Sequence, residues 1–183
     1  MIRIATLAFA LLLATPAVAD DAFTLKSADF EAGGKIAAEQ VFNGFGCKGA
    51  NVSPALAWSN APEGTKSFAV LVHDPDAPTG GSGWWHWLAF NIPADATGLA
   101  KGAGKQGGMP KGSVQSVTDY GKNGWGGPCP PPGPAHRYNF TVYALKVPAL
   151  DLKPSTNPAV VGYHVNANAI GKATLMGKFG RAK

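Results

Sequence analysis

Two histidines, two aspartates and a tyrosine stand where apolar runs of this chain meet turns. Asp74 and Asp76 belong to the run Asp-Pro-Asp-Ala-Pro, His86 to the run Trp-Trp-His-Trp, and His136 and Tyr138 to the run His-Arg-Tyr. Histidines are donors that can gain charge near neutral pH, and the tyrosine adds a hydroxyl donor. Proline-rich edges hold such side chains in place at a low entropy cost. The pattern predicts a small pocket that binds a phosphate-like anion.

The two aspartates fit an anion site less directly, because like charges repel. They can orient the histidines and keep them protonated, or they can accept hydrogen bonds from an ammonium group. A zwitterion such as phosphoethanolamine would use both kinds of group. The loop over residues 127–133 is expected to add free backbone N–H groups between its prolines, with Gly127 and Pro131 as the candidate ligand-binding residues.

A metal site and an esterase site are two alternatives to an anion pocket, and the sequence favours neither. His86, His136 and one carboxylate could form a facial metal triad, but the histidines do not have the close spacing typical of metal ligands. An esterase would need a G-x-S-x-G run, and residues 80–84, Gly-Gly-Ser-Gly-Trp, do not match it. We therefore expect no metal and no catalytic residues, so the protein is not expected to be an enzyme.

A glycine pattern of the G-x-G-x-x-G type occurs at Gly102, Gly104 and Gly107. A dinucleotide site needs a strand directly before this pattern and a helix directly after it. Here Pro93 and Gly98 precede it, and Pro110 follows. The segment over residues 98–113 is therefore predicted to be a surface loop, and no cofactor is expected.

Three apolar runs are the elements that must position the candidate site. They cover residues 66–73, 85–92 and 137–145, and they end or begin at the turns that carry the aspartates and histidines. Both alternating sets of residues in each run are apolar, and the third run is rich in β-branched and aromatic residues. This pattern predicts three strands in the middle of a sheet that is covered on both faces.

One segment has the pattern of a helix, from Pro158 to about Lys172. Asn157 can cap it, and Pro158 suits the first turn. Val161, Val165 and Ala169 fall on one stripe of this helix, and Gly171 or Gly177 could end it. His164 lies beside the apolar stripe and is interpreted as structural.

The first residues have the three parts of a secretory signal peptide. Arg3 supplies the early positive charge, an apolar run follows from Ile4, and Ala17-Val18-Ala19 forms the cleavage site. The alternative is an uncleaved membrane anchor, but the apolar run is shorter than the ~20 residues that span a bilayer. We predict a signal peptide over residues 1–19 and a single domain over residues 20–183, with a periplasmic or secreted location and no membrane span.

The two cysteines, Cys47 and Cys129, are expected to form a disulfide in an oxidising compartment. The alternative is a pair of small buried thiols. The formal net charge of +5 is mild, and no cluster of Lys and Arg is present, so nucleic acid is not an expected partner.

Four runs together resemble the signature segments of the phosphatidylethanolamine-binding protein family, also called the Raf kinase inhibitor protein family, and its bacterial YbhB/YbcL-type branch in particular. They are residues 51–58, 74–78, 84–93 and 127–138. The resemblance extends over essentially residues 23–179. It implies an all-β, mainly antiparallel fold, with a large central sheet packed against a smaller sheet and with a C-terminal helix.

The resemblance also implies roles for individual residues. Asp74, His86, His136 and Tyr138 match positions that line the anion pocket of the family, and Asp76 lies beside them. The expected function is that of an exported protein that binds a small anionic or phosphate-bearing ligand, such as a phosphoethanolamine-like or phospholipid head group. The alternative is a protein-interaction module that inhibits a kinase or a protease. The sequence leaves open whether the protein is a monomer or a homodimer.

Overall fold

Antiparallel strands form most of the regular structure of this protein, which is described here from a computed structural model that covers residues 22–182. The predicted signal peptide lies outside the described residues. In chain order the elements are β1 (Thr24–Lys26), β2 (Asn43–Gly44), β3 (Cys47–Lys48), β4 (Leu56–Ser59), β5 (Ser67–Asp74), β6 (Trp84–Pro93), β7 (Gly98–Leu99), β8 (Val114–Gln115), β9 (His136–Leu145), α1 (Pro158–Asn168) and β10 (Ala169–Phe179).

The large sheet has five strands in the order β10-β9-β5-β6-β8, with every neighbouring pair antiparallel. Its three inner strands are the three predicted from apolar runs, and β5 is buried at every residue except His73. Val70 of β5 pairs with Ala89 of β6 on one side and with Val142 of β9 on the other. The prediction of a central sheet made by these runs is confirmed.

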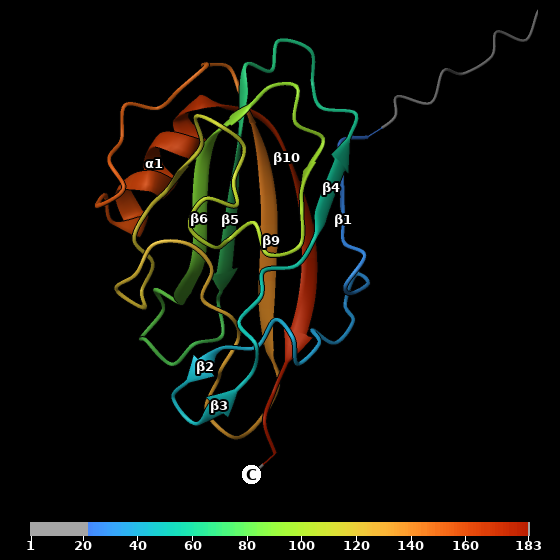
Figure 1. Ribbon diagram of the computed structural model, residues 1–183, viewed down its shortest axis with the longest axis vertical. Helices are drawn as coiled ribbons and strands as arrows, with labels where there is room; N and C mark the ends of the chain where they lie inside the picture. The colour runs from blue at the N-terminus through green and yellow to red at the C-terminus, as the bar shows by residue number, and fades with distance from the viewer. Residues whose placement is uncertain (1–21, 183) are drawn as a thin grey trace, which may run out of the picture.

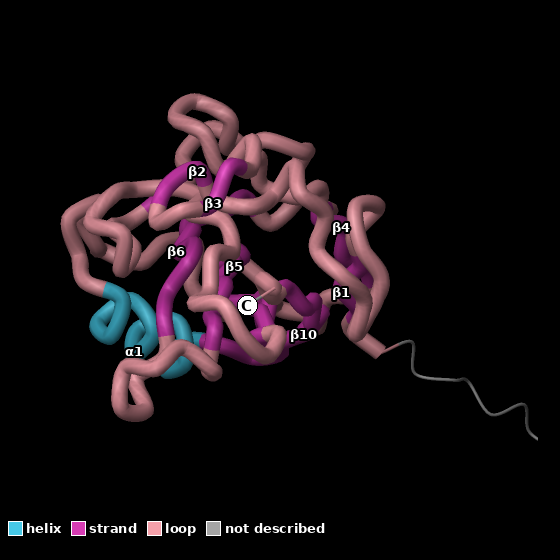
Figure 2. Tube along the Cα trace, turned by 90° about the horizontal axis from the view of Figure 1, so that it is seen from below, coloured by secondary structure: helices cyan, strands magenta, loops and turns pink. Residues whose placement is uncertain are grey.

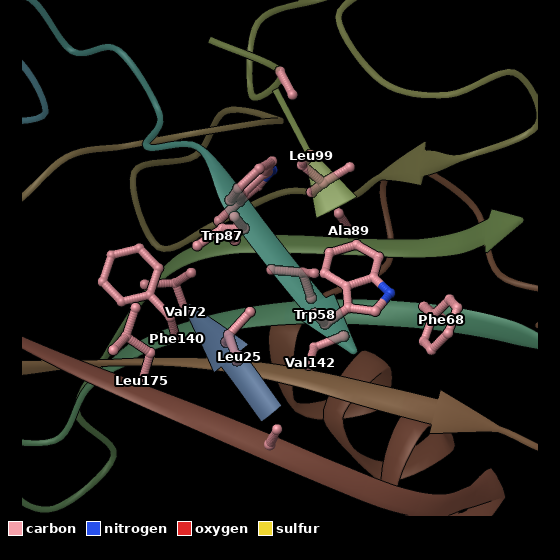
Figure 3. Close-up of a cluster of buried hydrophobic side chains, with 14 of the residues drawn as sticks. Leu25, Trp58, Phe68, Val72, Trp87, Ala89, Leu99, Phe140, Val142 and Leu175 are labelled. Carbon is pink, nitrogen blue, oxygen red and sulfur yellow. The ribbon is translucent and has the colours of Figure 1, made fainter. Parts of the chain in front are cut away.

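Each face of the large sheet is covered by a different layer, as Figures 1 and 2 show. The small sheet, in the order β1-β4-β7, lies over one face, and α1 lies over the other. Phe68 and Val72 of β5 pack in a cluster with Leu25 and Trp58 of the small sheet, and Figure 3 shows this core. The intervening Leu71 packs instead with residues of α1. Successive side chains of β5 therefore point to opposite faces of the sheet and contribute to the hydrophobic cluster on each face.

The helix begins as predicted and ends earlier. The Asn157 side chain accepts a hydrogen bond from the Val160 N–H at 3.0 Å, and Val161 and Val165 are fully buried. The helix ends at Asn168, and the segment predicted to be its last turn instead starts strand β10. Among the described residues, no helix is long and apolar enough to cross a membrane.

Strand β10 was not expected, because its glycines are typical of helix ends. A Cβ at Gly177 would press against Ile36 and Phe30, and one at Gly171 would press against Pro62. These glycines therefore mark places where other segments pack closely onto an edge strand. A second difference is β7, a short strand at the start of the loop predicted over residues 98–113. Both strands are held by partners distant in sequence.

The predicted disulfide is present. Cys47 of β3 is bonded to Cys129, with the two Cα atoms 6.0 Å apart and the two residues 82 positions apart in the sequence. The bond connects the β2–β3 hairpin to the proline-rich loop over residues 127–133. The hairpin's two strands pair only with each other, so the disulfide and the contacts of its flanks attach it to the domain.

Candidate anion-binding site

The candidate site lies at one end of the large sheet. Strand β5 ends there with Asp74, and its antiparallel neighbours β6 and β9 begin there with Trp84 and His136. The β2–β3 hairpin lies at this same end of the molecule in Figure 1. The antiparallel order of the strands therefore brings together side chains from three separate sequence runs.

A pocket of about 300 Å³ opens at this end of the sheet. Five of the seven predicted ligand-binding residues line it, and Asp76 and Gly127 do not. The lining residues are Phe45, Asp74, Ala77, Pro78, Thr79, Trp84, His86, Tyr120, Cys129, Pro130, Pro131, His136 and Tyr138.

The ring of His86 is held in one orientation by the Gly126 carbonyl. Its Nδ1 lies 2.6 Å from that oxygen, and because a carbonyl only accepts, Nδ1 carries a proton. The residue is 1% exposed, and burial lowers the pKa of His86 to about 4. At neutral pH the ring is therefore uncharged, and Nε2 is a bare lone pair with no partner among the described residues. The expectation that both histidines gain charge near neutral pH is wrong for His86.

His136 is oriented by Asp74, as expected for an aspartate behind a ligand-binding histidine. Nδ1 of His136 donates to Oδ2 of Asp74 at 2.8 Å, and Oδ1 of Asp74 accepts the Asp76 backbone N–H at 2.8 Å. The Asp74 side chain is only 4% exposed, and that of His136 is 13% exposed. This arrangement leaves Nε2 as the His136 atom available to a ligand.

Tyr138 and Tyr120 place two neutral hydroxyls at the pocket. Tyr138 is fully buried, and its hydroxyl has no partner among the described residues. Burial first, and then the charge of Asp74, raise the pKa of Tyr138 far above its usual value, so that the group stays protonated and can donate. Burial likewise raises the pKa of Tyr120, whose hydroxyl donates to the Gly127 carbonyl at 2.8 Å. The His86 ring packs edge-on against both tyrosines.

Asp76 has a different role from the predicted one. Arg137 donates to it through Nε at 2.9 Å, through Nη2 at 2.6 Å and through its backbone N–H at 2.8 Å. The side-chain hydrogen bonds from Arg137 are the largest cause that lowers the pKa of Asp76 to about 2. Both carboxylate oxygens are therefore engaged. Asp76 anchors the start of β9 to the turn after β5, and it is not among the residues that line the pocket.

Gly127 also lies outside the pocket, and its N–H is not free. It donates to Oδ1 of Asn51 at 2.8 Å, and a Cβ at this position would overlap the Gln40 carbonyl oxygen. The N–H of Gly133 donates to the Arg181 carbonyl at 3.1 Å. The other positions of this loop are prolines, which have no N–H, and Cys129. The loop therefore does not offer the expected row of backbone donors, and the N–H of Cys129 is the one that remains.

Three aromatic residues of the pocket were not predicted as ligand contacts. Trp84 was interpreted as packing, yet it lines the pocket, and its buried Nε1 has no partner among the described residues. Phe45, at the tip of the β2–β3 hairpin, has a positive φ of 52° and is 68% exposed. An exposed phenylalanine between two glycines was the available signal for this position, whereas nothing in the sequence places Tyr120 beside His86.

The metal hypothesis gains no support from the geometry. Within residues 22–182, no three side chains of the ligand types are grouped for a metal ion. The Nδ1 of His86 faces a carbonyl oxygen, and Asp74 already accepts two hydrogen bonds.

The protein has two packed antiparallel sheets and a pocket with polar side chains in its lining at one end of the larger sheet. These features define a class of β-sandwich domain. Within that class, residues 26–180 match the model of the phosphatidylethanolamine-binding proteins. The chain belongs to this family.

Bacterial relatives resemble the chain over nearly its full described length. The UPF0098 protein YbcL of Escherichia coli K12 is 50% identical over 157 residues, which cover 84% of this chain and 85% of YbcL. YbhB of the same organism is 46% identical over 156 residues, or 85% of this chain and 98% of YbhB.

Solved structures agree with this assignment. The crystal structure of E. coli YbcL, described as a new member of the mammalian PEBP family, superposes with a TM-score of 0.84 at 47% identity, covering 86% of this chain and 98% of YbcL. A PEBP homologue of Chlamydia trachomatis, CT736, has a TM-score of 0.74 at 30% identity, covering 88% of this chain and 99% of CT736.

Proposed function

We propose that this protein binds a small phosphate-bearing anion in the pocket and acts as a binding protein rather than as an enzyme. The observation that carries the proposal is a pair of buried polar atoms, His86 Nε2 and the Tyr138 hydroxyl, both without a partner among the described residues and both on residues that line one pocket. A buried polar group left unpaired costs about 1–3 kcal/mol. A ligand that pairs with both atoms would recover that cost on binding.

The distribution of polar and apolar groups supports a phosphate with an organic substituent. Tyr138 offers a hydroxyl donor in the pocket, and phosphate oxygens are strong acceptors. The lining also includes Phe45 and Pro131, whose apolar side chains suit the carbon part of a ligand. Asp76 does not line the pocket, and both oxygens of Asp74 already accept hydrogen bonds within the protein, so the pocket favours an amine less than a phosphate. The phosphate is thus the recognised group, and an ethanolamine part adds little.

Binding without turnover is supported by the state of the reactive groups in the pocket. The thiol of Cys129 is consumed by the disulfide, and the Thr79 hydroxyl donates to the Gly83 carbonyl at 3.0 Å. The raised pKa of Tyr138 makes its hydroxyl a poor nucleophile at neutral pH. Among the described lining residues, none is therefore an activated nucleophile beside a base.

An oxidising location outside the cytoplasm is part of the proposal. The disulfide between Cys47 and Cys129 supports it, because such bonds persist in secreted and periplasmic proteins. The predicted signal peptide over residues 1–19 points to the same compartment.

Calorimetric titration with inorganic phosphate and with phosphoethanolamine tests the function. Tyr138→Phe removes one hydroxyl and should weaken both ligands by roughly tenfold. His164→Ala is the control, because His164 lies on α1 and not in the pocket. Binding of neither ligand by the parent protein would contradict the proposal. Release of phosphate from a phosphoester by the parent, lost in His136→Ala, would make the protein an enzyme instead.

A further inference from the structure

Nε2 of His86 is a buried acceptor on a residue that lines the pocket, and it has no partner among the described residues. We propose that the pocket selects phosphate species that carry a hydrogen atom, namely hydrogen phosphate and phosphate monoesters, and discriminates against tetrahedral anions that carry none, such as sulfate and phosphodiesters. The inference rests on the proposed function, because it specifies which anions the same pocket accepts.

The first step is the fixed polarity of the His86 ring. The Gly126 carbonyl can only accept, so it requires a proton on Nδ1 at 2.6 Å. A proton on Nε2 as well would make a cation in a residue that is 1% exposed, where burial strongly disfavours charge. The neutral ring therefore offers a lone pair at Nε2, and this atom has no partner among the described residues.

The second step concerns the other charged and titratable groups around this ring. Asp74 of β5 favours a proton on His86, and His73, also of β5, opposes it. Tyr138 of β9 and Tyr120 of the segment before Gly126 pack against the ring edge-on, and both stay neutral because burial raises their pKa values. Burial outweighs the effect of Asp74, so the pKa of His86 is lowered to about 4.

The third step concerns the carboxylate that lines the pocket. Each oxygen of Asp74 already accepts one hydrogen bond, Oδ1 from the Asp76 N–H and Oδ2 from His136, so the unpartnered Nε2 of His86 is the acceptor that gains most from a ligand's hydrogen. The Tyr138 hydroxyl can donate to a phosphate oxygen, and a P–OH group can donate to Nε2 of His86. Sulfate at neutral pH has only acceptor oxygens, so it would place lone pair against lone pair at this position.

Two measurable consequences follow. The second pKa of a phosphate monoester is about 6, so at pH 7.5 the free monoester is mostly the dianion and must take up close to one proton when it binds. The affinity for the monoester should then fall about tenfold for each pH unit above this pKa of about 6. A phosphodiester, which includes the head group of a membrane phospholipid, has no such proton to offer. Soluble monoesters and phosphate are therefore the ligands that fit.

Calorimetry at pH 7.5 with phosphate and sulfate, two tetrahedral anions of similar size, tests the selection. We expect phosphate to bind at least about tenfold more tightly than sulfate. Phosphoethanolamine against glycerophosphoethanolamine compares monoester with diester in the same way. Repeating each titration in two buffers of different ionisation enthalpy counts the protons. Close to one should be taken up with phosphoethanolamine, whereas hydrogen phosphate, which already carries its hydrogen, and glycerophosphoethanolamine should take up clearly fewer. Equal affinities for phosphate and sulfate would overturn the inference.

The possible failures are distinguishable. If neither anion binds, the proposed function fails and the selection fails with it, whereas equal binding of both refutes the selection alone. A ligand-free measurement uses the nitrogen-15 shifts of the His86 ring between pH 5 and 8, where Nδ1 should be protonated and Nε2 unprotonated. A ring protonated at both nitrogens in that range would also refute the selection. His86→Gln, which can donate an amide N–H to either anion, should reduce the preference for phosphate to about threefold or less.

Discussion

His136 and Asp74, 62 residues apart in the chain, are joined by a hydrogen bond of 2.8 Å at the base of the pocket. Strands β5 and β9, which carry them, are neighbours in the large sheet, so the sheet register determines this contact. Because Asp74 holds Nδ1, the His136 ring can present only Nε2 to a ligand. The contact thus holds the His136 ring in one orientation, with Nε2 left for a ligand.

Asp74→Asn should lower phosphate affinity by roughly tenfold to a hundredfold, the worth of a charge-assisted hydrogen bond. The neutral amide replaces the carboxylate to which Nδ1 of His136 donates, so the hydrogen bond that orients the ring loses its charge. Asp151→Asn is a matched control, because Asp151 is exposed and lies outside the pocket. Calorimetry of both variants measures the effect, and equal affinities for the two would contradict the role of Asp74.

Stability should depend on pH through His86. Its folded pKa, about 4, lies below the ordinary value of 6.5, so the unfolded chain binds more protons between these values. The free energy of unfolding should therefore be highest above pH 6.5 and should fall by about 3 kcal/mol as pH drops to 4. Urea unfolding at several pH values measures this fall. It should be smaller in His86→Asn and unchanged in His164→Ala, and an equal fall in parent and His86→Asn would refute the assignment.

Replacing glycine with alanine should lower the free energy of unfolding at one position and raise it at another. In Gly127→Ala the new Cβ would overlap the Gln40 carbonyl oxygen, so we expect a loss of about 1–3 kcal/mol. Gly162 lies within α1 with open space around its Cβ position, and Gly162→Ala should gain roughly 0.5–1 kcal/mol. Thermal and urea unfolding compare the two variants. A neutral Gly127→Ala would show that its loop moves freely away from Gln40.

Loss of the disulfide should reduce the free energy of unfolding by roughly 4 kcal/mol in the chain-entropy model. The double variant Cys47→Ser, Cys129→Ser keeps residues of similar size and isolates the effect of the covalent bond. Unfolding by urea should shift to lower denaturant in this variant, and the parent treated with reductant should behave like it. Two free thiols in protein purified from its own compartment would contradict the bond itself.

The mature protein is expected to begin at Asp20 and to be found outside the cytoplasm. N-terminal sequencing of the exported form provides the measurement. An intact Met1 or Ile2 in exported material would show that the predicted signal peptide is not removed.

The sequence predicted those parts of the fold that depend on local pattern. The runs that became β5, β6 and β9 are apolar on both faces, and the start of α1 has a capping asparagine followed by proline. Strand β10 could not be predicted in this way. Its residues alternate weakly, and its glycines are explained only by Ile36 and Pro62, which pack against it from distant segments.

The same limit applies to the predicted site residues. Asp74, His86, His136 and Tyr138 lie near the ends of strands, and Pro131 lies in the loop before β9. All five line the pocket, and their part in ligand binding stays a prediction.

Asp76 and Gly127 belong to the same sequence runs as these residues, yet they do not line the pocket. Asp76 is hydrogen-bonded to Arg137, and Gly127 is hydrogen-bonded to Asn51. The charge state of His86 depends on complete burial beside Gly126, 40 residues away. Such neighbours arise from strand register and loop packing, which single-sequence patterns do not specify.

The bond between Cys47 and Cys129 also has a consequence for the order in which the protein matures. Cys129 lines the pocket, and Phe45, two residues before Cys47, lines its exposed edge. In a precursor whose thiols are still reduced, this part of the pocket is held only by noncovalent contacts, such as the packing of Phe45 on Phe42 and Tyr120. If the protein is exported and oxidised only after translocation, the covalent support of its pocket is added in the compartment in which it works.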